Sequence, residues 1–374
     1  MSSGLISLKS LWLKGLISLN LLTSLWWRKL AKAIKKKQAR VKLVAIAKDE
    51  AAYLPEWIFH HLKCSFDNIS IYINNTTDNT KEIIQCLKTH RNICFFNGDD
   101  FFADSQKDPQ VTIYKHEICK SRWQGYSHVM FLDIDEFLLS PNAVFDIKKY
   151  ANSVENEVSV FEWAHCLNED EPFLPAIRPD LLLKRAKQVK SLIPTHVYFE
   201  HLTPHNVYSK SLNYRETNGE QIQFARDNYT KVSATALNSP AKPAFVMHRM
   251  TRSEMEYVAA LVRGRPIKSS KVDSIFKNNR GGMFGHDNAL KYELPQEVVK
   301  AYRSELDKFL DNHRLHKPVE RAKEKVTERY LRAVDMIRSA PLSENKTLQK
   351  VLKNITLESV TSAFQSFKQH HKIN

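Results

Sequence analysis

The feature that most constrains the fold is a regular alternation of short apolar strands and amphipathic helices between residues 41 and 139. The apolar runs at 41–47, 68–73 and 92–96 are rich in β-branched and aromatic residues, as buried strands are. The segments between them place apolar residues three and four positions apart, which is typical of helices. Strands that alternate with helices at this spacing predict a parallel α/β sheet with helices on both faces.

Acidic and polar residues cluster where these predicted strands end. They are Asp49-Glu50, Asn74 to Asp78, Gly98 to Asp100 and Asp133 to Glu136. Ligands of open α/β sheets bind outside the carboxyl ends of the strands, so we expect these residues on one rim. No G-x-G-x-x-G follows the first strand and no G-x-x-x-x-G-K-[ST] occurs in the chain. The sequence therefore argues against a dinucleotide site and a P-loop.

Asp133 and Asp135 stand in FLDIDEFL, inside an apolar run that we predict to be a single strand, residues 128–139. Side chains two apart on a strand share a face, so both carboxylates would point the same way. Carboxylates removed from water need compensation, and a hard divalent cation with oxygen ligands suits such a pair. The pattern favours a metal or nucleotide-phosphate site, and a solvated strand end is the alternative.

Several histidines are candidate metal ligands. His248 lies between apolar residues in VMHRM, where a histidine is either a ligand or an ordinary core residue. His205, in HLTPHN, and the pair His60-His61 are weaker candidates, and the pair is expected to be structural because it lies in an amphipathic helix.

Arginines crowd the segment that begins at His248. They are Arg249, Arg252, Arg263 and Arg265. A diphosphate beside the metal would find cationic partners among them. A solvated basic helix face is the alternative.

A general base would be a carboxylate near the same rim but outside the metal site. Glu169 and Asp170, in the acidic segment NEDEP, and Asp287 are the candidates. Asp170 and Glu169 are the predicted catalytic residues, and ordinary surface acids are the alternative for each.

The formal net charge of +15 is concentrated at the two ends of the chain. Residues 1–40 carry nine Lys or Arg and no acid, and residues 314–374 carry a net charge of +7. The part between them is close to neutral. Because phosphate backbones bind where positive charge covers the binding face, we expect no nucleic-acid partner.

The amino-terminal segment, residues 1–40, joins an amphipathic apolar stretch to a basic cluster. Lys9 and Lys14 interrupt the apolar stretch, which is too short to cross a bilayer. We predict a helix lying on an anionic membrane surface, and packing on the protein's own core is the alternative. Residues 41–265 are then the expected catalytic domain, and residues 266–374 a basic helical C-terminal region.

Cysteine usage indicates the compartment. The five cysteines show neither C-x-x-C nor zinc-like spacing. We therefore expect reduced thiols and a cytosolic or cytosol-facing protein.

Four motifs together resemble GT-A glycosyltransferases, most closely the family-2-like branch related to family 92 that serves bacterial surface-polysaccharide assembly. VAIAKDEAAYLPEWIFHHL matches a K-N/D-E step followed by an L-x-E-W helix, and NNTTDNT matches an S-T-D-G/N-T turn. DIDEF matches the D-x-D-E-F signature in full. HRMTRS matches H-Y-x-x-K-S in part, since Arg249 and Arg252 replace Tyr and Lys.

The resemblance covers roughly residues 41–265 and implies a GT-A, Rossmann-like fold with a mixed, mainly parallel sheet flanked by helices. It implies a nucleotide-diphosphate sugar as donor, with a UDP-sugar favoured, and a Mn²⁺ or Mg²⁺ ion. The implied metal ligands are Asp133, Asp135 and His248. The implied nucleotide contacts are Lys48, Asp49, Glu50, Asp78 and Asp133.

The same resemblance implies an inverting transfer of one sugar to a lipid-linked glycan acceptor such as lipopolysaccharide. The enzyme would then be peripheral on the cytoplasmic face of the bacterial inner membrane. One alternative is a sugar-phosphate nucleotidyltransferase, against which the glycine-free segment after the first strand counts. Another is a non-catalytic module that binds membranes or nucleic acid.

Overall fold

The computed structural model describes residues 38–103, 108–154, 156–167, 169–225, 228–238, 242–264 and 274–373. Contacts divide the chain into Met1–Ala39 and Arg40–Asn374, and the fold described below is that of the second unit. The predicted membrane-binding helix of residues 1–40 lies almost entirely outside the described residues. Among those residues, no helix is both long and apolar enough to cross a membrane.

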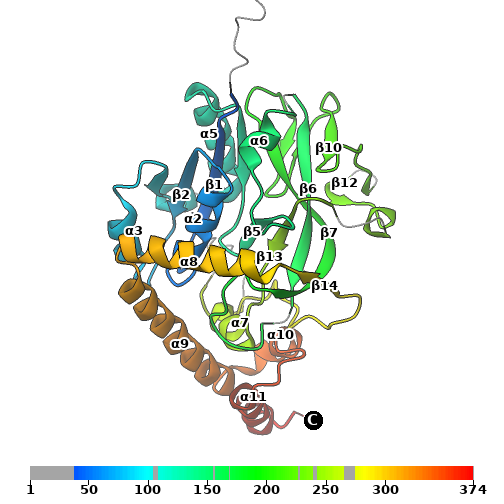
Figure 1. Cartoon of the computed structure of the whole chain (residues 1–374). Coiled ribbons are helices and arrows are strands. Elements are labelled where there is room, and N and C mark those ends of the chain that lie inside the picture. The colour runs from blue at the N-terminus through cyan, green and yellow to red at the C-terminus, as the bar shows by residue number, and fades with distance from the viewer. Residues whose placement is uncertain are drawn as a thin grey trace, which may run out of the picture. The chain divides into compact units, whose positions relative to one another are not determined.

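A parallel half-sheet occupies the amino-terminal part of this unit, with strand order β3-β2-β1-β4. Its strands are β1 (Val41–Ala47), β2 (Asn68–Ile73), β3 (Ile93–Asn97) and β4 (His128–Phe131). The helices of this part are α2 (Leu54–Lys63), α3 (Thr80–Leu87), α4 (Asp99–Ala103), α5 (Pro109–Trp123) and α6 (Ile147–Ala151). Residues of β1, β2 and β4 are almost all buried, since helices cover both faces of the sheet (Figure 1).

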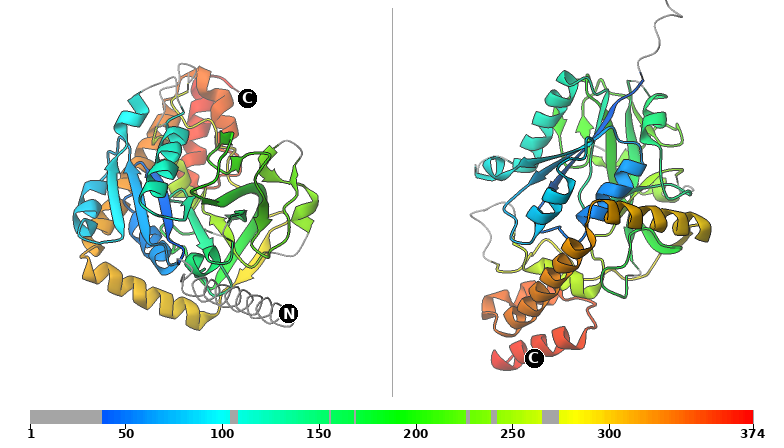
Figure 2. Two further views of the ribbon diagram at one scale, coloured as in Figure 1. Left: turned by 90° about the horizontal axis from the view of Figure 1, so that it is seen from above. Right: turned by 60° about the vertical axis from the view of Figure 1, so that its left-hand side comes forward.

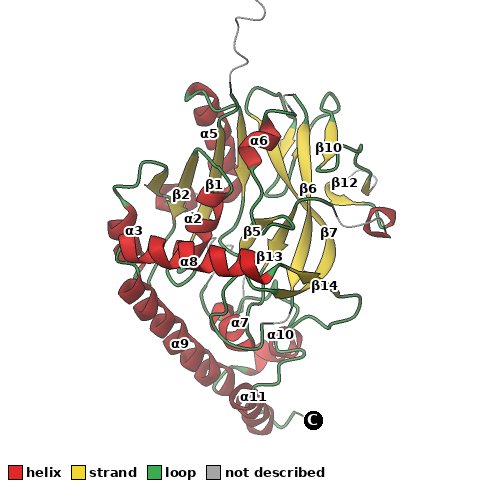
Figure 3. Ribbon diagram, in the orientation of Figure 1, coloured by secondary structure: helices red, strands yellow, loops and turns green. Residues whose placement is uncertain are grey.

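A second half-sheet continues from β4 in the order β7-β6-β13-β5, and its pairings are mixed. Its strands are β5 (Glu136–Leu139), β6 (Val158–Cys166), β7 (Asp180–Pro194) and β13 (Phe245–His248). Shorter strands extend or border it: β8 (His201–Leu202), β9 (Val207–Tyr208), β10 (Tyr214–Glu216), β11 (Phe224–Ala225), β12 (Asn228–Val232) and β14 (Leu290–Glu293). The predicted mixed α/β sheet flanked by helices is confirmed (Figure 3).

The predicted single strand at residues 128–139 is wrong. The chain leaves β4 after Phe131, turns through residues 132–135, and enters β5 at the other end of the sheet order, beside β13. The turn is closed by hydrogen bonds from the Glu136 amide to the Asp133 carbonyl (3.0 Å) and from the Asp133 amide to Glu136 Oε2 (2.8 Å). Asp133 and Asp135 therefore lie in a turn between two strands.

The carboxyl-terminal part is helical. It contains α7 (Glu254–Leu261), α8 (Gln296–Asn312), α9 (His316–Arg338), α10 (Asn345–Val351) and α11 (Glu358–His370). One apolar cluster joins α7, α9, α10 and α11, with Tyr257, Ala333 and Phe367 among its buried members. Figure 2 (right) shows α8, α9 and α11 at the end of the sheet away from the amino end of β1. β14 pairs with β7, so the helical region also contributes a strand to the sheet. The predicted domain boundary at residue 265 stays a prediction.

His60 and His61, on α2, are buried and neutral. His60 Nε2 donates to the Leu138 carbonyl and His61 Nδ1 donates to the Trp57 carbonyl, each at 2.8 Å. Burial lowers the pKa of His60 to about 4, and it lowers the pKa of His61 well below its ordinary value, with His60 adding to the effect. Their structural role agrees with these contacts.

We expect the protein to lose stability steeply as the pH falls from about 6.5 to about 4. In this window the unfolded chain protonates both histidines and the folded chain does not, so each contributes a loss of about 1.4 kcal/mol per pH unit. Urea unfolding at several pH values measures the slope. In a His60→Gln variant, the free energy of unfolding should depend less steeply on pH, by the equivalent of about one bound proton. Equal slopes for the variant and the wild type would contradict the argument.

Candidate active site

A cavity of about 580 Å³ opens at the carboxyl ends of β1 and β4. Of the nine residues predicted as catalytic residues, metal ligands or nucleotide contacts, five line it: Lys48, Glu50, Asp133, Asp135 and His248. Four do not line it: Asp49, Asp78, Glu169 and Asp170. A site at the carboxyl ends of the strands, as the strand order predicted, thus exists. It contains only some of the predicted site residues.

Asp49 and Asp78 hold the segment that follows β2. Asp49 Oδ1 accepts hydrogen bonds from the hydroxyl groups of Thr76 and Thr77, both at 3.1 Å. Asp78 accepts from the amides of Ala51 and Thr80, both at 2.9 Å. The two carboxylates therefore fix the loop that borders the cavity.

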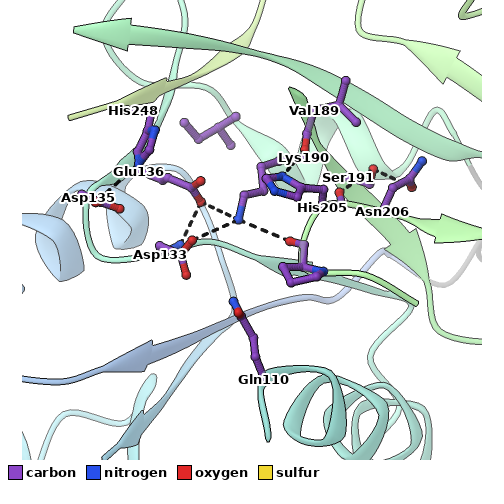
Figure 4. A network of polar contacts seen from close by, with 12 residues as sticks. Gln110, Asp133, Asp135, Glu136, Val189, Lys190, Ser191, His205, Asn206 and His248 are labelled. Carbon is purple, nitrogen blue, oxygen red and sulfur yellow. Dashed lines mark hydrogen bonds and ion pairs between the residues drawn. The ribbon is translucent and has the colours of Figure 1, made fainter. Parts of the chain in front are cut away.

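Lys190 lies behind the Asp133–Asp135 turn and neutralises part of its charge (Figure 4). Its Nζ is 2.8 Å from Glu136 Oε2 and 3.4 Å from Asp133 Oδ2. Burial alone would lower the pKa of Lys190, but the carboxylates of Asp133 and Glu136 raise it above its ordinary value. The ammonium group stays charged, and the Asp133 side chain, 41% exposed, stays open to the cavity.

Asp135 and His248 are neighbours in the lining of the cavity. His248 Nε2 is 3.4 Å from Asp135 Oδ2, and the imidazole stacks on Trp163 with ring centroids 4.1 Å apart. The amide of Arg249 donates to the Asp135 carbonyl (2.8 Å), which ties the end of β13 to the turn. A carboxylate suits Mn²⁺ or Mg²⁺, and a neutral imidazole is a common metal ligand.

The fit to a metal ion is limited to these two ligands. Within the described ranges, no group of three or more His, Cys, Asp or Glu side chains is arranged to hold a metal. Asp133 is engaged by Lys190 instead. The buried Nδ1 of His248 has no hydrogen-bond partner among the described residues. A divalent ion here would need its other ligands from a bound substrate or water.

Basic side chains also line the cavity. Lys48, Arg263, Lys277 and Arg280 line it, and Glu50 pairs with Arg263 and with Arg252 behind it. The side chains of Lys277 and Arg280 form no hydrogen bond or ion pair with the residues that the structure describes. Burial, followed by repulsion from Arg263 and Arg280, lowers the pKa of Lys277 well below its ordinary value. A bound anion would relieve this repulsion.

The predicted general bases lie elsewhere. Glu169 is buried and forms a bidentate ion pair with Arg249, with N–O distances of 2.7 and 2.8 Å. Arg178 lies 3.5 Å from the same carboxylate. Asp170 and Asp287 are exposed and do not line the cavity. Their catalytic roles stay predictions.

The sequence reasoning missed or underrated the other polar residues of the cavity. They include His205, Lys277 and Arg280, which line the cavity, and Lys190, which lies behind the Asp133–Asp135 turn. Lys190 lies on β7, a strand that the local pattern did not reveal, and Lys277 and Arg280 lie in the connection between α7 and β14. His205 was visible only as a lone histidine beside a proline.

No family model matches this chain, and no curated protein matches it. Among solved structures, it is similar to S. aureus TarS 1–349, with 9% identity over 89% of this chain and 91% of that chain, and a TM-score of 0.29. The same fragment in complex with UDP-GlcNAc is 10% identical over 88% of this chain and 92% of that chain, with a TM-score of 0.29. The galactosyltransferase LgtC, in complex with donor and acceptor sugar analogues, is 15% identical over 32% of this chain and 46% of that chain, with a TM-score of 0.21. Because these identities and scores are low, the functional argument rests on the cavity itself.

Proposed function

We propose that this chain is a glycosyltransferase that moves one sugar from a nucleotide-diphosphate donor to a glycan acceptor. One observation carries the proposal: the Asp133–Asp135 turn and four basic side chains line a single cavity at the carboxyl ends of the strands. That is the place where open α/β sheets bind ligands. A nucleotide-diphosphate sugar offers the diphosphate that these cations require and hydroxyl groups for the carboxylates.

The cations would hold the diphosphate. Arg263 and Arg280 can bind phosphate oxygens in bidentate geometry, and Lys48 supplies further charge. A bound diphosphate would favour the charged form of Lys277. In an in-line displacement the diphosphate departs with an additional negative charge, which preorganised cations stabilise. Lys48, Glu50 and Asp133 remain the proposed nucleotide or sugar contacts, and Asp49 and Asp78 would act by fixing the bordering loop.

The proposed metal site consists of Asp135 and His248. A Mn²⁺ or Mg²⁺ ion bound there would neutralise charge on the donor's diphosphate. Neighbouring residues hold both ligands in place. Trp163 supports the imidazole of His248, and the Arg249 amide fixes the Asp135 backbone.

The proposed acceptor is a lipid-linked glycan such as lipopolysaccharide, and the proposed donor is a UDP-sugar. The basic residues of 1–40 and 314–374 support attachment to an anionic membrane surface. A peripheral position on the cytoplasmic face of the bacterial inner membrane and an inverting outcome belong to the same proposal.

Thermal unfolding with UDP, GDP, CMP and dTDP, each with Mn²⁺ and with EDTA, tests the donor class. We expect one nucleotide to raise the melting temperature, because a ligand at 100 times its Kd stabilises the folded state by about 2.7 kcal/mol. Under the metal proposal, EDTA reduces the shift. Uridine, which lacks the diphosphate, is the matched control and should give little shift. The absence of a shift with every nucleotide would contradict the proposed function.

A further inference from the structure

His205 presents an unused nitrogen to the cavity. It lies in the turn between β8 and β9 and lines the cavity together with Asp133, Asp135 and His248. His205 Nδ1 is 3.2 Å from the Val189 carbonyl oxygen. A carbonyl oxygen can only accept, so Nδ1 carries the hydrogen and Nε2 keeps its lone pair. Nε2 forms no hydrogen bond with the residues that the structure describes.

The turn that carries His205 is rigidly built. Thr203 Oγ1 accepts from the amides of His205 and Asn206, at 3.2 and 3.1 Å. The buried Asn206 side chain accepts from Ser191 Oγ (2.8 Å) and donates to the Tyr229 carbonyl (2.8 Å). Trp163 packs against the His205 ring at 5.5 Å in an edge-on arrangement. These contacts fix the ring orientation, as a group that must meet a reacting atom requires.

The other proton acceptors of the cavity are engaged. Glu50 pairs with Arg252 and Arg263, Asp133 with Lys190, and Asp135 with His248. Glu169 is locked by Arg249 and does not line the cavity. Among the described residues that line the cavity, His205 combines a defined tautomer with an unused basic nitrogen, whereas the unpartnered Nδ1 of His248 is buried.

Figure 4 shows where His205 lies relative to Asp135 and His248, the proposed metal ligands. Asp135 and His248 lie at one side of the polar network, His205 lies at the other, and Asp133 and Lys190 lie between them. An in-line displacement needs its nucleophile on the side opposite the leaving group. In this view His205 lies on the side of the network away from Asp135 and His248, the proposed ligands of an ion that would bind the leaving diphosphate.

We propose that His205 Nε2 is the general base that deprotonates the acceptor hydroxyl; this inference rests on the proposed function. The acceptor O–H proton passes to Nε2 as the acceptor oxygen forms a bond to the anomeric carbon. The bond from that carbon to the donor's phosphate oxygen breaks, and its electron pair leaves with the nucleoside diphosphate.

The charged groups around His205 keep it able to accept a proton. Burial, followed by the charge of Lys190, lowers the pKa of His205 to about 4, so the ring is neutral at physiological pH. Asp133 and the hydrogen bond to Val189 act in the opposite direction, and His248 adds to the lowering. The negative charges of a bound donor would raise the affinity of Nε2 for a proton during the reaction.

The test compares UDP release from UDP-glucose, UDP-galactose and UDP-GlcNAc by wild type, His205→Ala and His205→Gly, with calorimetric binding of UDP to each. We expect release to fall at least about 100-fold in both variants. The Kd for UDP should stay within about twofold of wild type, since the base does not hold the nucleotide. Added imidazole should restore release by His205→Gly, which a purely structural role would not allow. His201→Ala, an exposed histidine on β8, is the matched control.

The outcomes separate the two proposals. UDP binding with undiminished release by His205→Ala overturns the role of His205 and leaves the proposed function standing. Reduced release with weakened UDP binding and no response to imidazole also overturns it, and indicates a structural role. A wild-type protein that neither binds UDP nor releases it overturns both proposals.

Discussion

Replacing Asp135 with alanine is expected to lower the rate of UDP release from a UDP-sugar by at least about 10²–10³-fold. The carboxylate lines the cavity and faces His248 at 3.4 Å. Burial alone would raise the pKa of the Asp135 carboxyl, but His248, followed by Arg252 and Arg280, holds it well below its ordinary value. The residue therefore supplies a full negative charge, and alanine removes both the proposed metal ligand and the partner of His248.

The loss should be catalytic, with the fold retained. The backbone carbonyl of Asp135, which accepts from the Arg249 amide, is unchanged by the substitution. Initial rates of UDP release in Mn²⁺, together with the melting temperature, separate the two effects. Asp311→Ala is the control, because Asp311 is 71% exposed on α8. Normal release by Asp135→Ala would remove this carboxylate from the mechanism.

The elements that the sequence predicted most closely are buried ones with short, local signals. The apolar runs at 41–47 and 68–73 are β1 and β2, with the bounds that were expected. Each is continuous in sequence and buried along nearly all of its length. Burial on both faces makes the apolar run itself the signal, and no distant contact is needed to recognise it.

The long strand β7 was not predicted, because its charges find partners only through the fold. Lys184, Arg185, Lys187 and Lys190 interrupt the apolar pattern of residues 180–194. Arg185 pairs with Glu162 on β6, and Lys190 pairs with Glu136 at the start of β5. A cation inside a strand is acceptable when an acid from a distant segment neutralises it. A single sequence does not reveal such a pairing.

The same limit explains which site residues were found. Asp133, Asp135 and His248 carry local signals, since each stands among apolar residues. His205, Lys277 and Arg280 come from loops whose positions depend on strand pairings far along the chain. The division of residues 128–139 into β4 and β5, which the sequence pattern did not show, also decides the geometry of the site. The antiparallel pairing of β5 with β13 places Glu136 opposite His248.

The pair of Glu169 and Arg249 gives the largest stability prediction. Glu169→Ala is expected to lower the free energy of unfolding by about 3–5 kcal/mol, because it leaves a buried guanidinium without its bidentate partner. The Glu169 side chain is fully buried and that of Arg249 is 4% exposed. Burial alone would raise the pKa of Glu169, but Arg249 lowers it below its ordinary value, so the pair is ionised. Urea unfolding at neutral pH measures the loss.

A double-mutant cycle distinguishes this structural role from the catalytic role predicted for Glu169. Replacing both residues with apolar ones of similar size, Glu169→Leu with Arg249→Met, should recover most of the stability that either single change removes. The folded fraction of Glu169→Ala should then release UDP at a rate close to wild type. Asp335→Ala, which breaks an exposed pair with Arg338, should cost no more than about 0.5 kcal/mol. If Glu169→Ala is as stable as wild type but inactive, the carboxylate acts in the chemistry, and the search for the base returns from His205 to Glu169.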